Sequence, residues 1–242
     1  MSLIVTGGSR GIGASIARLA AADGWDVCLS YLSNEAAAQE VVQDCRKHGT
    51  RAIAVRADVS VETDVVALFD QAENELGPLR GLVNNAGIVG QKSLLRDYQS
   101  GRTERIFATN VFGAFSCARE AVRRFGSLGG VIVNVSSRAA ELGSAGEYVD
   151  YAASKAAVDT LTVGLAREVA RDGIRVNAVR PGLIHTDMHA SGGQPDRIGR
   201  LAGTIPMGRG GDPDEIAEAV VWLLSDKASY TTGAIIDVSG GR

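Results

Sequence analysis

The sequence is poor in cysteine, in aromatic residues and in long apolar runs. Its 242 residues include only three cysteines, Cys28, Cys45 and Cys117, and 5% of the residues are aromatic. The cysteines are far apart and form no C-x-x-C motif, which argues against both a disulfide framework and a zinc site. No apolar run approaches the roughly 18 residues that a membrane-spanning helix needs. We therefore expect a reduced protein without a membrane span.

Neither sign of charge dominates, because 25 Lys and Arg face 28 Asp and Glu and give a net charge of −3. The sequence has no basic block and no alternation of basic and aromatic residues, so we expect no nucleic-acid partner. Its first residues, MSLIVTGG, lack the basic leader of a signal peptide. These features predict a cytoplasmic protein.

Short β-branched runs alternate along the chain with segments of helical period. Strands are expected at residues 2–5, 26–31, 51–58, 81–87, 130–137, 174–182 and 233–241. Helices are expected at residues 13–24, 35–48 and 212–226, among others. Nearly continuous apolar strands that alternate with helices indicate a parallel sheet covered on both faces.

The pattern predicts a single α/β domain over residues 1–242, with a doubly wound Rossmann fold. Its seven-stranded sheet should be mostly parallel, with helices on both faces. The one long irregular stretch, residues 186–211, is rich in glycine and predicts a substrate loop or lid.

A glycine-rich turn, TGGSRGIG, follows the first predicted strand at Thr6–Gly13. Gly7, Gly11 and Gly13 let the backbone turn tightly and approach an anionic ligand. The free N–H groups and the positive end of the following helix then favour a phosphate. A nucleoside triphosphate loop would need lysine where this chain has Ala14, so that kind of site is excluded.

Tyr151 and Lys155, in the segment YAASK, have the spacing of two side chains on one helix face. On a helix they would lie about 6 Å apart along the axis. A neighbouring ammonium group stabilises a tyrosinate, so we expect Lys155 to lower the pKa of Tyr151 from its usual value near 10. On spacing alone, a solvated helix face is the favoured interpretation; together with the other motifs, the pair is a candidate for acid–base catalysis.

These motifs, together with NNAG at 84–87 and PGLIHT at 181–186, resemble the short-chain dehydrogenase/reductase family over essentially the full chain. The 3-oxoacyl-[acyl-carrier-protein] reductase and glucose 1-dehydrogenase branches are the most similar. The resemblance implies an oxidoreductase that transfers a hydride between a nicotinamide cofactor and a carbonyl or secondary alcohol.

The resemblance also implies four catalytic residues: Asn110, Ser137, Tyr151 and Lys155. Tyr151 would be the general acid or base, Ser137 would orient the substrate oxygen, and Asn110 would support a water next to Lys155. Ser137 lies fourteen residues before Tyr151, one more than is usual, so Ser136 remains a weaker alternative.

The cofactor contacts that the resemblance implies run from the glycine turn to the nicotinamide end. They are Gly7, Ser9, Arg10, Gly11, Ile12, Gly13, Ser33, Asn34, Asp58, Val59, Asn85, Ala86, Gly87, Tyr151, Lys155, Pro181, Gly182, Ile184 and Thr186. No acid ends the second predicted strand before Glu35, whereas an NAD enzyme usually has one there to bind the ribose hydroxyls. Arg10 would attract a 2′-phosphate, with Ser33 and Asn34 as further donors. NADP(H) is therefore the expected cofactor, with NAD(H) as the alternative.

The substrate is constrained only to a small carbonyl or alcohol compound. Glu141, Glu147 and Asp150 follow the fifth predicted strand and favour a sugar or polyol, although a helix dipole alone would also favour Asp150. A 3-oxoacyl thioester is the alternative. It is weakened because GSLGG, rather than a basic segment, precedes that strand, with Arg123 and Arg124 nearby.

Two other sets of residues are given no catalytic role. Tyr148 has no lysine one turn later, so we expect it to pack or to lie in the substrate loop. His185, Asp187 and His189 share a loop without further ligands, so no metal site is expected.

The apolar segments AVVWLLS and GAIIDVSGG, near the end of the chain, resemble those through which relatives form tetramers. A homotetramer is expected, with a dimer as the alternative. A non-catalytic NADP(H)-binding redox sensor or scaffold is the alternative of a different class. The presence of all four catalytic residue types disfavours it.

Overall fold

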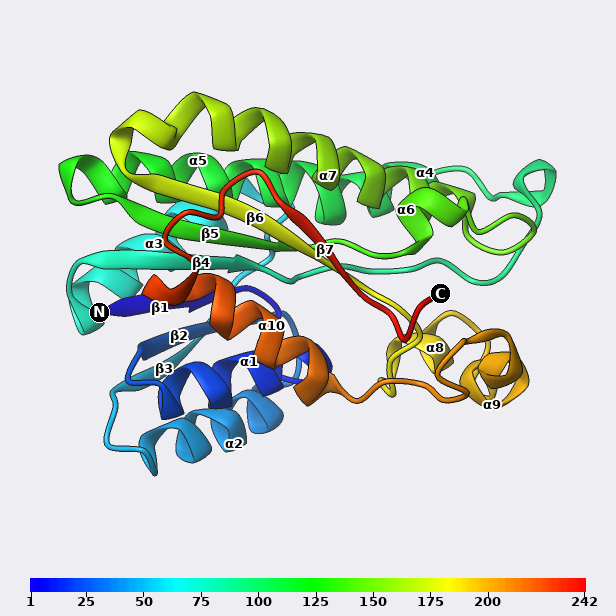
Figure 1. Cartoon of the computed structure of the whole chain (residues 1–242), viewed down its shortest axis with the longest axis horizontal. Helices are drawn as coiled ribbons and strands as arrows, with labels where there is room; N and C mark the ends of the chain where they lie inside the picture. Colours follow the sequence, from blue (N-terminus) through cyan, green and yellow to red (C-terminus); the bar gives the residue numbers. More distant parts are fainter.

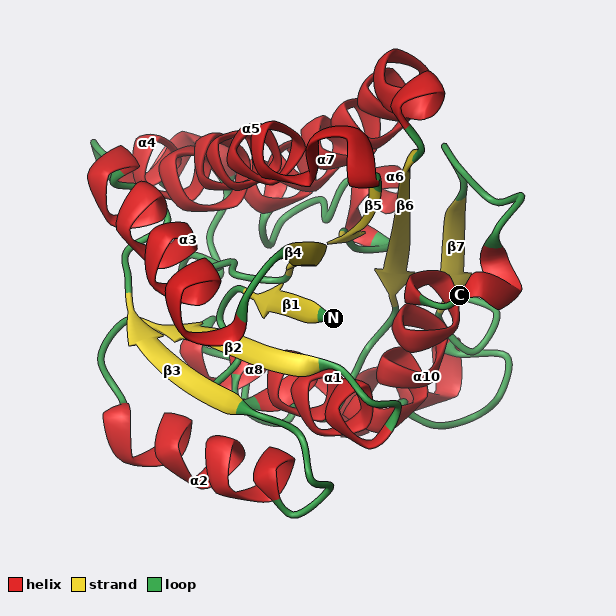
Figure 2. Ribbon diagram, turned by 90° about the vertical axis from the view of Figure 1, so that its left-hand side faces the viewer, coloured by secondary structure: helices red, strands yellow, loops and turns green.

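A single sheet of seven parallel strands lies between two layers of helices in the computed structural model, which describes residues 1–242 (Figures 1 and 2). The strands are β1 (Ser2–Val5), β2 (Asp26–Tyr31), β3 (Ala52–Arg56), β4 (Leu79–Asn84), β5 (Gly130–Val135), β6 (Ile174–Pro181) and β7 (Ile235–Val238). Their order across the sheet is β3-β2-β1-β4-β5-β6-β7, and every neighbouring pair is parallel. The predicted doubly wound α/β fold is confirmed.

The helices divide into two layers, one on each face of the sheet (Figure 2). One layer consists of α1 (Gly11–Ala22), α2 (Glu35–Arg46) and α10 (Pro213–Leu224). The other consists of α3 (Glu62–Leu76), α5 (Gly113–Phe125) and α7 (Val149–Val169), with α4 (Arg102–Phe107) leading into α5. Two apolar clusters of 29 and 21 buried residues fill the two interfaces. Burial on both faces explains why the strands inside the sheet are mostly apolar.

Local sequence explains where several helices begin. Asp212 and Glu215 form a capping box at the start of α10, with Pro213 in its first turn. The Asn34 side chain accepts a hydrogen bond from the Ala37 N–H and caps α2. No side chain caps α1, which begins at Gly11, so its first N–H groups have no partner within the helix.

The structure differs from the sequence predictions at element ends. α1 begins two residues earlier than expected, because the last glycines of the turn already belong to the helix. α2 ends at Arg46, before Gly49 with its positive φ of 82°. Residues 186–211, expected to be irregular, contain the short helices α8 (Met188–Ser191) and α9 (Arg197–Leu201). Helices of one turn are too short to show a period in sequence.

The three cysteines are free and buried. No helix of the chain has the length and apolar character that crossing a membrane requires. The strands β1, β4, β5 and β6 all end at the same edge of the sheet, and the order reverses between β1 and β4. In open α/β sheets, ligands bind at such an edge and such a reversal.

Candidate functional site

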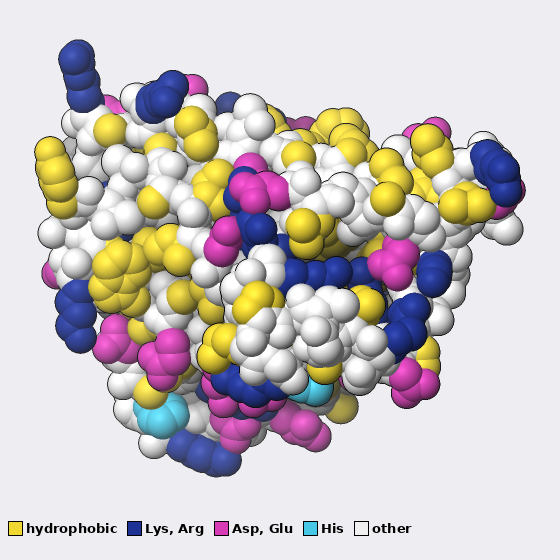
Figure 3. Space-filling view, turned by 45° about the vertical axis from the view of Figure 1, so that its right-hand side comes forward, with side chains coloured by type: hydrophobic (Ala, Val, Ile, Leu, Met, Phe, Trp, Pro, Cys, Tyr) yellow, Lys and Arg dark blue, Asp and Glu magenta, His cyan; other side chains and the backbone are white.

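A cleft of about 740 Å³ lies at this edge of the sheet. It is lined by all 19 residues predicted to contact the cofactor, and by Ser137. Asn110, the remaining predicted residue, lies behind the cleft wall and is buried. Figure 3 shows a hollow on one face of the molecule with Lys and Arg side chains along it.

The glycine turn occupies one end of the cleft in a conformation that suits only glycine. Gly7 and Gly11 have positive φ angles of 64° and 53°. A Cβ on Gly13 would lie 2.4 Å from the Gly7 carbonyl oxygen and 2.5 Å from Asn85 Nδ2. Backbone conformation at Gly7 and Gly11, and close neighbours at Gly13, therefore require glycine at these positions.

Three polar side chains, those of Thr6, Ser30 and Asn85, hold this turn against the sheet. Only Asn85 was predicted as a site residue. The Ser30 hydroxyl accepts a hydrogen bond from the Gly7 N–H at 3.1 Å. Thr6 Oγ1 accepts from the N–H groups of Asn85 and Ala86, both at 3.0 Å. Asn85 Nδ2 donates to the Thr6 and Gly7 carbonyl oxygens. The turn is thus held in place before any ligand binds.

The residues present fit the phosphates of a dinucleotide. The first turn of α1 has no acidic residue and no capping side chain, so its N–H groups and the helix dipole favour an anion. Thr186 lies over the turn, since a Cβ on Gly11 would meet its methyl group at 3.3 Å. The cleft is therefore bounded on its far side by the loop that begins at Thr186.

The polar groups expected at the adenosine end lie along the same wall. Asp58 Oδ1 accepts from the N–H and hydroxyl of Ser60, which leaves its second oxygen without a protein partner. Ser33 is exposed, and Asn34 uses its carbonyl oxygen to cap α2. The Arg10 side chain is 69% exposed. It lies 4.0 Å from Asp187, which is also exposed, so this ion pair is weak.

Tyr151 lies in the first turns of α7 and lines the cleft beside Ser137. Burial raises the pKa of the Tyr151 phenol, while a hydrogen bond with Ser137 and the positive charge of Arg197 lower it. On balance the pKa of Tyr151 is raised, and Lys155 is not among the groups that shift it. The prediction that Lys155 lowers this pKa is therefore wrong. Ser136 points elsewhere, since its hydroxyl donates to the Lys155 carbonyl oxygen at 3.2 Å. Of the two serines, Ser137 contacts the phenol.

The Lys155 amine lies 5.8 Å from the centre of the Tyr151 ring. It donates to the Val135 carbonyl oxygen at 2.7 Å, at the end of β5. Burial lowers the pKa of Lys155 to about 8, against the opposing charge of Asp159. A Cβ on Gly87 would lie 3.4 Å from this amine, so the backbone at Gly87 leaves the amine open to the cleft.

Asn110 lies in a π-helical segment, η2 (Ala108–Phe112), between α4 and α5. Its Oδ1 accepts from the Ile88 N–H at 2.8 Å, and its Nδ2 donates to the Ile88 carbonyl and to Ser154. Such π-bulges are frequent at functional sites. Here the bulge turns the Asn110 amide toward α7 and the backbone next to Gly87.

An ion pair that sequence reasoning missed anchors the start of α7. Asp150 and Arg102 are almost fully buried and 2.7 Å apart. Tyr98 stacks on the Arg102 guanidinium at 3.8 Å and donates its hydroxyl hydrogen to Asp150. Asp150 Oδ1 also accepts the N–H of Tyr151 at 2.9 Å. The backbone of the candidate catalytic tyrosine is therefore tied directly to this pair.

The carboxylates that favoured a sugar or polyol are not free to bind one. Asp150 is engaged as just described, and Glu141 forms ion pairs with Arg138 and Arg180. Neither lines the cleft. Glu147 does line it but binds Arg197 at 2.5 Å. The expectation that these three acids face a polyol is therefore wrong for two of them, and the third is already paired.

Tyr148 packs as expected, between the loop after β5 and residues 186–211. Its hydroxyl donates to the Gly192 carbonyl at 2.9 Å and accepts from Gln194 Nε2 at 2.7 Å. The Arg197 guanidinium lies 5.0 Å from the Tyr148 ring centre. Arg197 and Arg242 both line the cleft, and no sequence pattern singled them out. No group of three His, Cys, Asp or Glu side chains is arranged to hold a metal ion.

Comparison with known proteins identifies the family of this chain. A family profile described as enoyl-(acyl carrier protein) reductase matches residues 7–242. The uncharacterized oxidoreductase YgfF of Escherichia coli is 54% identical over 99% of this chain and 98% of its own length. 3beta-Hydroxysteroid dehydrogenase 1 of Eggerthella lenta is 41% identical over 99% and 92%. The 3-oxoacyl-[acyl-carrier-protein] reductase FabG of Staphylococcus aureus is 38% identical over 99% and 97%.

Solved structures with the same fold support this family assignment. A short-chain dehydrogenase/reductase mutant from Serratia marcescens superposes with a TM-score of 0.92 at 33% identity, over 99% of this chain and 96% of its own. A blue fluorescent protein from a metagenomic library, in complex with NADPH, gives 0.92 at 37% identity over the same shares. The chain therefore belongs to the short-chain dehydrogenase/reductase family and is a nicotinamide-dependent oxidoreductase that acts on CH–OH groups.

Proposed function

We propose that this protein transfers a hydride between NADP(H) and a carbonyl or secondary alcohol, with Tyr151 as the general acid or base. One observation carries the proposal. The phenol of Tyr151, the hydroxyl of Ser137 and the amine of Lys155 open into the same cleft as the uncapped, glycine-lined start of α1. A dinucleotide held by the glycine turn would have its reactive end beside these three groups.

In reduction, the carbonyl carbon gains a hydride and its oxygen gains a proton. The bound nicotinamide supplies the hydride, and this is the chemistry that the protein side chains cannot provide. Tyr151 gives the proton, and Ser137 orients the oxygen by a hydrogen bond. Both hydroxyl groups line the same cleft and lie next to each other, which suits binding of an oxygen that becomes an alkoxide.

Lys155 and Asn110 act on the cofactor and on proton supply. With its pKa lowered to about 8, the Lys155 amine is suited to exchange protons near neutral pH. Its position beside Gly87 suits a hydrogen bond to the nicotinamide ribose. Asn110 holds the backbone at Ile88 and Ser154 of α7 in place behind that amine.

Arg10 is proposed to confer the preference for NADP(H). Its guanidinium lies at the start of α1, exposed and weakly paired, with no acid at the end of β2 to repel a phosphate. We expect Arg10→Ala to raise the Kd of NADPH by about 10-fold, because a charge-assisted bond to phosphate is lost. The Kd of NADH should change less than about twofold. Fluorescence titration of both cofactors measures this, with the exposed, distant Arg171→Ala as control; equal losses for both cofactors contradict it.

A homotetramer is proposed, with a dimer as the alternative. Large apolar side chains are exposed on two separate elements: Phe112 and Phe115 at the start of α5, and Trp222 on α10 beside the edge strand β7. Two distinct self-complementary faces generate a tetramer, whereas one generates a dimer. Light scattering distinguishes these states, and a monomer would overturn both.

The function is tested by a substrate panel followed through the absorbance of reduced nicotinamide. Ketones, 3-oxoacyl thioesters, an enoyl thioester, sugars and polyols are each paired with NADP(H) and NAD(H). We expect turnover of a ketone or alcohol with NADP(H). Reduction of the enoyl thioester alone would contradict carbonyl chemistry. NADPH binding without any turnover would favour the sensor role.

A further inference from the structure

The end of the cleft beyond Tyr151 carries more positive charge than its neighbours balance. Arg197, on α9, and Arg242 both line the cleft there. Arg197 is near enough for its charge to act on the Tyr151 phenol, and also on Arg242. Two guanidinium groups therefore lie near one another and near the group that handles the proton.

Only one carboxylate faces these two cations. Glu147 binds Arg197 at 2.5 Å and also lies 3.9 Å from Lys92, so it is shared between two positive charges. The Arg197 Nε is buried and has no hydrogen-bond partner. The Arg242 side chain forms no ion pair or hydrogen bond. Burial and the charge of Arg197 lower the pKa of Arg242, and the charge of Glu147 opposes them.

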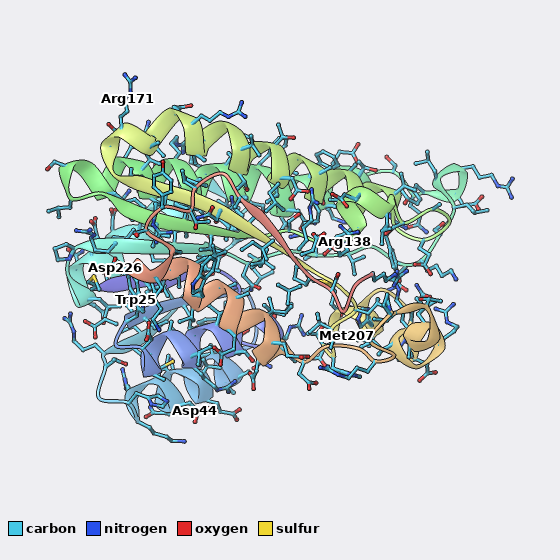
Figure 4. The ribbon with its side chains drawn as sticks, viewed as in Figure 1. Trp25, Asp44, Arg138, Arg171, Met207 and Asp226 are labelled. Carbon is cyan, nitrogen blue, oxygen red and sulfur yellow. The ribbon has the colours of Figure 1, made fainter.

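The other arginines beside the cleft are neutralised by the protein itself. Arg138, labelled in Figure 4, binds Glu141 and Asp237 and donates to the Arg242 main-chain oxygen at 2.6 Å. Arg180 binds Asp159, Glu141 and Asp237. Apart from Arg10 in the glycine turn, the unbalanced arginine charge in the cleft therefore lies on Arg197 and Arg242, and Arg138 holds the backbone of Arg242 in place.

Apolar groups lie around the same end of the cleft. Leu142, Met188 and Leu201 line it, together with the Tyr148 ring, which faces Arg197. A ligand with an acid group at one end and a short hydrocarbon body would meet both kinds of surface. The Arg242 guanidinium lines the cleft and has no carboxylate bonded to it, so an incoming carboxylate that bonds to it is favoured.

We propose that the substrate is an oxo acid or hydroxy acid whose carboxylate binds Arg197 and Arg242 while its carbonyl or carbinol group meets Tyr151 and Ser137. This inference rests on the proposed function and names its substrate class. Because Arg197, Arg242 and the Tyr151 phenol line one cleft, an acid group and a reacting carbon that bind them together fit a single short molecule. The phosphate of a carrier-bound thioester is separated from its carbonyl by a long chain, so that source of anion fits less well.

The test uses matched pairs of short oxo acids and their methyl esters, such as 4-oxopentanoate, 5-oxohexanoate and 4-oxocyclohexanecarboxylate, with NADPH. We expect kcat/KM to be at least about 10-fold higher for an acid than for its ester. Arg242→Gln should remove most of this preference through KM, and leave the esters unchanged. The charge-balanced double variant Arg197→Gln with Glu147→Gln should also lower the ratio of kcat/KM for acid to kcat/KM for ester, although its effect on Tyr151 can change the turnover of both. Arg171→Gln, on a distant exposed turn, is the matched control and should change nothing (Figure 4).

A binding measurement separates this inference from the proposed reaction. In Tyr151→Phe with NADPH, calorimetry should detect the acids but not the esters, and Arg242→Gln should weaken acid binding about 10-fold. Turnover of neutral ketones and esters as fast as acids, without selective acid binding, overturns the anionic substrate and leaves the hydride transfer standing. Acid binding that depends on Arg242, but no turnover of any pair, supports the anion site and counts against the reaction. Absence of both overturns the inference.

Discussion

Tyr151→Phe should lower turnover at least about 1,000-fold while the Kd of NADPH stays within about twofold. Loss of a positioned general acid typically costs 10²–10⁴-fold in rate. The substitution removes only the phenol oxygen, whose protein contact is Ser137. The ring and the N–H bond to Asp150 remain, so α7 should keep its position. Turnover is followed by nicotinamide absorbance, and cofactor affinity by fluorescence titration.

Tyr148→Phe is the matched control, because it removes a phenol oxygen three residues earlier in the same cleft. That oxygen bonds Gly192 and Gln194, within residues 186–211, rather than facing Ser137. We expect it to raise KM and to change kcat less than about 10-fold. If Tyr151→Phe retained more than about a tenth of the turnover, the acid–base role would have to be assigned to another group.

The fold and the glycine turn could be predicted because each is dictated by local sequence. Strands buried on both faces must be apolar throughout, and a positive φ at Gly7 and Gly11 must have glycine. The period of a helix places Tyr151 and Lys155 on one face, but only the other motifs of the chain made this pair a candidate site. These features depend on neighbours within one element or one turn.

Features that depend on contacts between distant segments could not be predicted in this way. Arg102 and Asp150 are 48 residues apart, and nothing near either residue indicates a buried ion pair. Arg197 lies within residues 186–211, which show no period in the sequence, so its place in the same cleft as Tyr151 became visible only in the folded chain. The expected effect of Lys155 on the Tyr151 pKa was wrong for a related reason. Helical spacing gives the face of a side chain but not its bonds, and the Lys155 amine bonds to Val135.

Arg102→Met should cost about 3–5 kcal/mol of stability, the largest loss we expect from one substitution outside the glycine turn. It leaves the Asp150 carboxylate buried without its cation, and breaking a buried pair from one side has this cost. For a chain of this length, the loss corresponds to a Tm lower by about 10 °C. Thermal unfolding followed by circular dichroism measures it.

A double-mutant cycle with Asp150→Asn assigns this loss to the pair itself. Asparagine keeps an oxygen for the N–H of Tyr151 and the hydroxyl of Tyr98 but carries no charge. The double variant should therefore be more stable than the sum of the two single losses predicts, by at least about 1 kcal/mol. Additive losses would show that Arg102 acts by packing on Tyr98 instead. Because Asp150 is bonded to the Tyr151 backbone, kcat should fall in Arg102→Met even at temperatures where the variant is fully folded. An unchanged kcat there would show that the pair stabilises the start of α7 without positioning the Tyr151 phenol.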